Sequence, residues 1–181
     1  MKYLHLSLMC LMLSGFLFIR CSNSNTQADA ASTTEAVIPP YPKTDSVPPV
    51  TKPIPSLELL DLEGKPFNLT TLGGNPVVVF FDPECDHCQR ECRAIEKRKS
   101  EFEGRKIYFV SIESSKVVRK FQLEYRLTDP QFQFATGDLK TIVNAMGPIP
   151  SVPCFYIYKD GLLAHRIEGE AEVDEILEKM K

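Results

Sequence analysis

The pattern of apolar and polar residues changes near residue 56, and from there predicted strands and helices alternate. Residues 77–81 (VVVFF) and 107–112 (IYFVSI) are apolar with little alternation, which is typical of central strands covered on both faces. Each run precedes a segment with apolar side chains at helical spacing, one over residues 86–102 and one that begins near residue 114. These two strand-and-helix units predict parallel strands at the centre of a sheet.

Shorter elements flank the two units. A hairpin is expected around the turn at residues 63–64, and another around residues 159–161. A short helix over residues 138–147 lies before the second hairpin, and a last helix over residues 173–180 follows it. The order is therefore hairpin, strand, helix, strand, helix, short helix, hairpin and helix. It predicts an α/β fold of three layers, α/β/α, with a central mixed sheet and an N-terminal β-hairpin extension.

Residues 1–20 have the form of an export signal. Lys2 is a short charged start, and the apolar stretch after it is short for a membrane span of about 20 residues. Cys21 follows directly. Bacterial lipoprotein signals resemble this arrangement, which implies that Cys21 is lipidated and becomes the mature N-terminus. Arg20 departs from the usual pattern, and the alternatives are cleavage after Ala30 or an uncleaved anchor.

Residues 21–55 form a segment of a different kind. They are rich in Ser, Thr, Asn and Ala and then in proline. Such a composition cannot bury enough apolar surface to order itself, so we expect a Pro/Ser-rich disordered tether. The globular domain is then expected at 56–181. The expected location is the bacterial cell envelope, as a membrane-anchored lipoprotein facing the periplasm, or otherwise secreted or periplasmic.

Size and charge limit the domain count and the class of partner. A chain of 181 residues that is 43% hydrophobic has room for one globular core but hardly for two. The formal net charge is -3, and charges of both signs are mixed along the chain. It lacks the basic surface on which nucleic-acid binding depends, so we expect no nucleic-acid partner.

Two cysteines stand where a buried strand gives way to a helix. Cys85 lies at the helix start, where unpaired backbone N–H groups and the helix dipole favour a thiolate nucleophile. Cys88 lies one turn further on, close enough to attack a mixed disulfide on Cys85 and act as the resolving thiol. A protonated His87 would stabilise the thiolate, whereas the carboxylate of Glu84 would raise the thiol pKa. The sequence does not decide between these two effects.

The residues around the two cysteines resemble a known family. Residues 60–88 (LDLEGKPFNLTTLGGNPVVVFFDPECDHC) resemble the beginning of a thioredoxin-fold domain of the TlpA-like type. Ser151-Val152-Pro153, followed by a strand and a turn, is similar to the cis-proline loop of the same fold. The resemblance spans about residues 56–181. It implies a thioredoxin-like fold and a thiol-disulfide oxidoreductase that acts on protein substrates.

The resemblance also implies roles for particular residues. Cys85-Asp86-His87-Cys88 would be the active site, with no cofactor beyond the redox-active Cys85–Cys88 disulfide and no metal. The partners would be protein thiols and disulfides and a membrane or periplasmic redox protein. The Val152-Pro153 peptide bond would be cis, face the cysteine pair and offer the Val152 backbone to an extended substrate.

The general base departs from the family pattern. Thioredoxins place a buried acid at the position that is Val79 in this chain. We therefore expect the base to be Glu84, Asp82 or water.

Two other activities remain as alternatives. A thioredoxin-fold copper chaperone would add a distant histidine to paired cysteines, and His165 is the candidate, although such cysteines are usually spaced one residue wider. A thiol peroxidase would need a threonine where Asp82 stands. A zinc site is disfavoured because the chain has no second C-x-x-C.

The two remaining cysteines of the domain have a structural and a redox interpretation. Cys92 is expected in the core on the inner helical face, with an extra resolving thiol as the alternative. Cys154 begins the strand beside the active site. We expect a small buried side chain there, with a third redox thiol close to Cys88 as the alternative.

Overall fold

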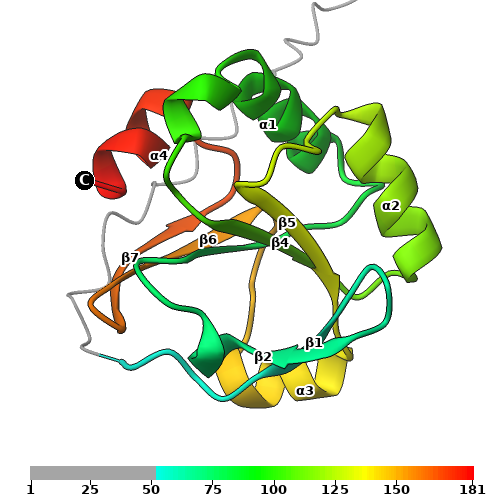
Figure 1. Ribbon diagram of the computed structural model, residues 1–181, viewed down its shortest axis with the longest axis vertical. Coiled ribbons are helices and arrows are strands. Elements are labelled where there is room, and N and C mark those ends of the chain that lie inside the picture. The colour runs from blue at the N-terminus through cyan, green and yellow to red at the C-terminus, as the bar shows by residue number, and fades with distance from the viewer. Residues whose placement is uncertain (1–51) are drawn as a thin grey trace, which may run out of the picture. The chain divides into compact units, whose positions relative to one another are not determined.

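The computed structural model describes residues 52–181, in which a seven-stranded mixed sheet lies between two helical layers (Figure 1). The strand order is β2-β1-β5-β4-β3-β6-β7, and β4 pairs in parallel with β3 and β5 while every other pair is antiparallel. The strands are β1 (Glu58–Asp61), β2 (Pro66–Asn68), β3 (Val77–Phe80), β4 (Ile107–Ser111), β5 (Phe132–Thr136), β6 (Cys154–Lys159) and β7 (Leu162–Glu168). The helices are α1 (Asp86–Lys97), α2 (Ser115–Glu124), α3 (Leu139–Met146) and α4 (Val173–Lys179), with 3-10 turns η1 (Leu69–Thr71) and η2 (Lys99–Phe102).

The sheet buries both of its faces, as the uninterrupted apolar strands predict. Val77 and Val79 of β3 pack in the core under α1, α2 and α4, whereas Val78 and Phe80 pack in a second core on the side of α3. All four residues of β3 are buried, so this strand needs apolar residues at every position. The predicted three-layer α/β/α fold with a mixed sheet is confirmed.

One strand was not predicted. β5 carries buried Phe132 and Phe134 on either side of exposed Gln133, which is the alternation of a strand. It pairs in parallel with β4 and antiparallel with β1, so it connects the N-terminal hairpin β1-β2 to the central strands. The order predicted from the sequence, which had six strands, is wrong by this one element.

The helix predicted over residues 86–102 ends earlier, at Lys97. A continuous helix would place Lys99 one turn after buried Ile95, on the face that packs against the sheet. The chain instead turns into η2, which lets Lys99 form an ion pair with Asp129 at 2.8 Å while Phe102 remains fully buried. The polar residue in the apolar stripe therefore ends the helix.

The predicted signal peptide, Cys21 and most of the predicted tether lie outside the described residues. The end of that tether is described and contacts the domain, where Pro53 bridges to Leu162 and the Ile54 N–H donates to the Gly161 carbonyl at 3.0 Å. None of the helices within residues 52–181 is long and apolar enough to cross a membrane.

Glu91 is the one charged residue that is buried within residues 52–181. Its Oε2 accepts a hydrogen bond from the Ala171 N–H at 2.8 Å, and its Oε1 has no partner among the described residues. Burial raises the pKa of this carboxyl to about 7, and the charges of Glu170 and Glu172 act in the same direction. The fold thus holds a carboxyl group that titrates near neutral pH.

Glu91→Gln is expected to change how stability depends on pH. The folded-state pKa of about 7 lies above the ordinary value of 4.5, so the folded protein keeps a proton that the unfolded chain releases. The free energy of unfolding then falls as pH rises from 4.5 to about 7 and is level above that. Glu91→Gln lacks this loss. Its free energy of unfolding minus that of wild type should therefore be higher at about pH 8 than at low pH, by up to about 3 kcal/mol.

Urea unfolding of wild type and variant at low and at slightly alkaline pH measures this difference. Glu124→Gln, at an exposed position on α2, is the matched control and should keep the wild-type pH dependence. Identical pH dependence of Glu91→Gln and wild type would show that the buried carboxyl does not titrate as stated.

Candidate redox site

The two cysteines of the C-x-x-C are positioned by the junction between β3 and α1. After β3 the chain makes a tight turn in which the Cys85 N–H donates to the Asp82 carbonyl at 3.1 Å and the Glu84 N–H donates to Asp82 Oδ1 at 2.8 Å. Cys85 is the N-cap residue of α1, and its carbonyl accepts the Gln89 N–H at 3.0 Å. The outer cysteine therefore lies at a helix N-terminus, as the sequence predicts.

The two thiols differ in exposure. Both are free, with Cys85 partly exposed and Cys88 fully buried on the inner face of α1. Burial raises the pKa of Cys88 to about 12, although a hydrogen bond from the Asp82 backbone opposes the rise. A molecule arriving from solvent can therefore reach the sulfur of Cys85 but not that of Cys88. Cys88 can react only with a group that is already bound to Cys85.

The loop before β6 faces this pair. The Val152-Pro153 peptide bond is cis, and the Cys85 thiol contacts the Val152 carbonyl with an Sγ–O distance of 3.7 Å. The Pro153 carbonyl in turn accepts the Gly169 N–H at 2.8 Å. The cis bond and its position opposite the cysteines agree with the expectation from the sequence.

His87 does not stand alone beside the cysteines. Its Nδ1 lies 2.9 Å from Glu170 Oε2 and 2.7 Å from Arg90 Nη2, and its side chain is 62% exposed. Glu84 is exposed, and its backbone N–H rather than its carboxylate makes the local hydrogen bond. The structure thus brings His87 into a charged cluster and gives Glu84 no comparable contact.

Glu91 is the site residue that sequence reasoning missed. It lies one helical turn after Cys88, and its buried carboxyl has a pKa near neutrality, whereas Glu84 and Asp82 are exposed. Among the expected bases Glu84, Asp82 and water, Asp82 is the acid that acts on Cys88, whereas Glu91 acts on Cys92. The sequence did contain a signal for this acid. Glu91 lies between two cysteines that are expected to face the core, and burial away from water disfavours the charged form of its carboxyl group.

The other two cysteines are both buried, but in different places. Cys92 packs with Cys88 in the core under α1, and burial raises its pKa well above the ordinary range. Cys154 packs in the opposite core, on the side of α3. Cys154 is thus separated from Cys88 by the sheet, in agreement with the expectation of a small buried side chain.

The described part of the chain contains no cluster of metal ligands. Among residues 52–181, no group of three or more His, Cys, Asp or Glu side chains is placed to hold an ion. His165, the candidate ligand of the copper alternative, lies on β7 opposite Ile157 of β6.

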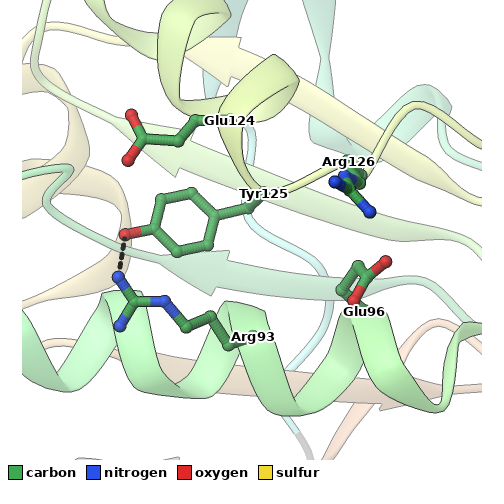
Figure 2. A pocket seen from close by; sticks show the side chains of 5 residues that line it. All are labelled: Arg93, Glu96, Glu124, Tyr125 and Arg126. Carbon is green, nitrogen blue, oxygen red and sulfur yellow. Dashed lines mark hydrogen bonds between the residues drawn. The ribbon is translucent and has the colours of Figure 1, made fainter.

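Several hollows in residues 52–181 lie away from the cysteines. One of about 290 Å³ is formed between α1 and the end of α2, where Arg93 donates to Tyr125 Oη at 3.1 Å and its guanidinium lies 5.1 Å from the ring centroid (Figure 2). The residues that line this hollow and three others do not include Cys85 or Cys88. The thiol of Cys85 is partly exposed at the surface.

Comparisons with known proteins agree with this geometry. The sequence profile of the AhpC/TSA family matches residues 50–163. The thiol-disulfide oxidoreductase ResA of Bacillus thuringiensis (strain Al Hakam) is 25% identical over 129 residues, which cover 69% of this chain and 73% of ResA. The chloroplastic peroxiredoxin Q of Sedum lineare is 24% identical over 139 residues, covering 70% of this chain and 75% of that protein.

A solved structure shares the fold. The secreted Mycobacterium tuberculosis disulfide oxidoreductase that is homologous to Escherichia coli DsbE superposes with a TM-score of 0.59 at 18% identity. The match covers 69% of this chain and 94% of the other. At this identity the likeness concerns the fold, and it agrees with the predicted thioredoxin-like architecture. The family profile matches more than half of the sequence. The chain therefore belongs to the AhpC/TSA family of thioredoxin-like proteins.

Proposed function

We propose that this protein is a thiol-disulfide oxidoreductase that exchanges disulfides with protein substrates through Cys85 and Cys88. The observation that carries the proposal is the unequal pair: a partly exposed thiol at a helix N-terminus with a buried thiol one turn behind it. The helix N-terminus favours the thiolate of Cys85. The similarity to ResA and the AhpC/TSA family supports the same chemistry.

The reaction in the reducing direction takes two steps. The Cys85 thiolate attacks one sulfur of a substrate disulfide, so that a mixed disulfide forms and the other substrate sulfur leaves as a thiolate that takes up a proton. The Cys88 thiol then loses its proton and attacks the Cys85 sulfur. This step releases the second substrate thiol and leaves a Cys85–Cys88 disulfide. Two electrons pass to the substrate, and the reverse sequence oxidises a dithiol.

The second step needs a proton acceptor, because burial holds the pKa of Cys88 at about 12. We assign this transfer to Asp82, whose backbone and carboxylate both act on Cys88, or to a water molecule.

The cis-proline loop supplies the contact for a substrate peptide. The Val152 carbonyl already contacts the Cys85 thiol, so its backbone is adjacent to the position where a mixed disulfide forms. An extended substrate segment that pairs with this backbone would bring its own sulfur to Cys85.

A thiol peroxidase is the second candidate, because peroxiredoxin Q is among the similar proteins. Its chemistry would use the same Cys85 thiolate on a peroxide instead of a disulfide. Consumption of hydrogen peroxide that depends on Cys85, together with failure to reduce a protein disulfide, would favour this candidate.

The location completes the proposal. We place the protein in the bacterial cell envelope, anchored by a lipid on Cys21 with the domain facing the periplasm and with a membrane or periplasmic redox protein as partner. The apolar stretch before Cys21 and the proline-rich segment after it support this placement.

The roles of the two thiols predict opposite results for two serine variants. Cys88→Ser should accumulate mixed disulfides with substrate proteins, because the first step proceeds and the second cannot. Cys85→Ser should form none and reduce insulin only at the uncatalysed rate. Non-reducing electrophoresis of each variant after reaction with substrate measures the trapped species.

Cys154→Ser is the matched control, because it removes a buried thiol on the other side of the sheet. It should turn over as wild type does. Equal trapping by Cys85→Ser and Cys88→Ser, or activity that survives in Cys85→Ser, would contradict the assignment.

Lipidation predicts a change of fraction for a single variant. Cys21→Ala should lose metabolic acyl labelling and move from the membrane fraction to the soluble periplasm, because the lipid is the proposed anchor. Ser22→Ala, beside the modified residue, should stay labelled and membrane-bound. An intact mass that shows an unmodified N-terminus beyond residue 21 would rule out this anchor.

A further inference from the structure

The loop between β7 and α4 contacts two parts of the redox site through its backbone. The Gly169 N–H donates to the Pro153 carbonyl at 2.8 Å, and the Ala171 N–H donates to Glu91 Oε2 at 2.8 Å. Between these two residues, the side chain of Glu170 reaches the first turns of α1. The backbone of the loop is thus held on both sides of Glu170, to the cis-proline loop and to α1.

Glu170 forms one cluster with the only two basic or imidazole side chains in residues 82–92. Arg90 Nη2 donates to Glu170 Oε2 at 2.7 Å, and Arg90 Nε lies 3.1 Å from each carboxylate oxygen. His87 Nδ1 is 2.9 Å from the same Oε2. A fork-like Arg–carboxylate pair with a third member is the kind of surface network that holds a geometry, unlike an isolated exposed pair.

The hydrogen bonds allow His87 either charge state. Its Nδ1 carries a proton when it donates to Glu170, and it has a free lone pair when it accepts from Arg90 Nη2 at 2.7 Å. Arg90 and His87 lower the pKa of Glu170, so its carboxylate is ionised at neutral pH. Its negative charge therefore lies beside the positive charge of Arg90, and of His87 when that ring is protonated.

Arg90 and His87 are the basic and the imidazole side chain nearest in sequence to Cys85. The other charged residues of the turn and of the first turns of α1 are acids, namely Asp82, Glu84, Asp86 and Glu91. A positive charge beside a thiol favours its thiolate, and a negative charge favours the neutral thiol. The effect of His87 and Arg90 on the acidity of the Cys85 thiol thus depends on how much of their positive charge is cancelled by a nearby negative charge.

We propose that Glu170 is a positioning residue of the redox site, which holds His87 and Arg90 in one cluster and offsets their charge at Cys85. The inference rests on the proposed function and adds to it a residue that sets the redox poise. Glu170 keeps the thiol of Cys85 less acidic and the Cys85–Cys88 pair more reducing than the His87 and Arg90 charges alone would make it.

The test is Glu170→Gln, which removes the charge and keeps the size of the side chain. Alkylation of Cys85 in the reduced protein, followed against pH, should show a lower thiol pKa. The thiolate fraction at pH 7 should rise about threefold, the effect of one unit charge several ångströms away in a high dielectric. That factor corresponds to a reduction potential about 14 mV less negative. Arg90→Gln should move both quantities in the opposite direction.

Glu172→Gln is the matched control, because it removes the same charge two residues further on, from a side chain with no hydrogen bond to His87 or Arg90. It should leave the alkylation profile as in wild type. The inference is overturned if Glu170→Gln and Glu172→Gln behave alike.

The alkylation profile needs no turnover, so this inference and the proposed function can fail separately. A wild type that reduces insulin while Glu170→Gln leaves the Cys85 pKa unchanged contradicts the inference alone. A wild type that reduces no protein disulfide while Glu170→Gln lowers the Cys85 pKa contradicts the proposed function alone.

Discussion

The start of α1 directly after the buried strand β3 is the constraint on which the redox site depends. β3 is a central strand that is buried on both faces, and α1 begins a few residues after its carboxyl end. Helical geometry then places Cys85 at the exposed end and Cys88 on the face that packs against the sheet. The burial that raises the pKa of Cys88 follows from this placement.

The β7–α4 loop complements this arrangement from the other end of the chain. Three successive residues of the loop contact the cis-proline loop, the residues between and after the cysteines, and the buried carboxyl group. The cis-proline loop and α1 are thus both held by hydrogen bonds to a loop that is far from them in sequence. The chemistry of the inner thiol depends on burial, which raises its pKa.

Much of this arrangement could be predicted from the sequence, and the exceptions have physical reasons. Apolar runs and a C-x-x-C at a strand-to-helix junction are local signals, so the central strands, α1 and the roles of exposed and buried thiol could be predicted. β5 was missed because five residues with two phenylalanines are too short to give a firm period, and its identity as a strand depends on pairing with β4 and β1. The cluster of His87, Arg90 and Glu170 could not be predicted, since it joins residues 80 or more positions apart. Glu91 gave a signal, but its raised pKa depends on burial, which only the packed structure shows.

The claim that the two thiols are unequal can be tested most directly by mapping alkylation in the folded, reduced protein. A limiting amount of iodoacetamide at neutral pH, followed by peptide mass analysis, gives the order in which the cysteines react. The account predicts that Cys85 is modified first and alone, and that the buried Cys88, Cys92 and Cys154 react only after unfolding. Modification of Cys88 in the folded protein at a rate similar to that of Cys85 would contradict it.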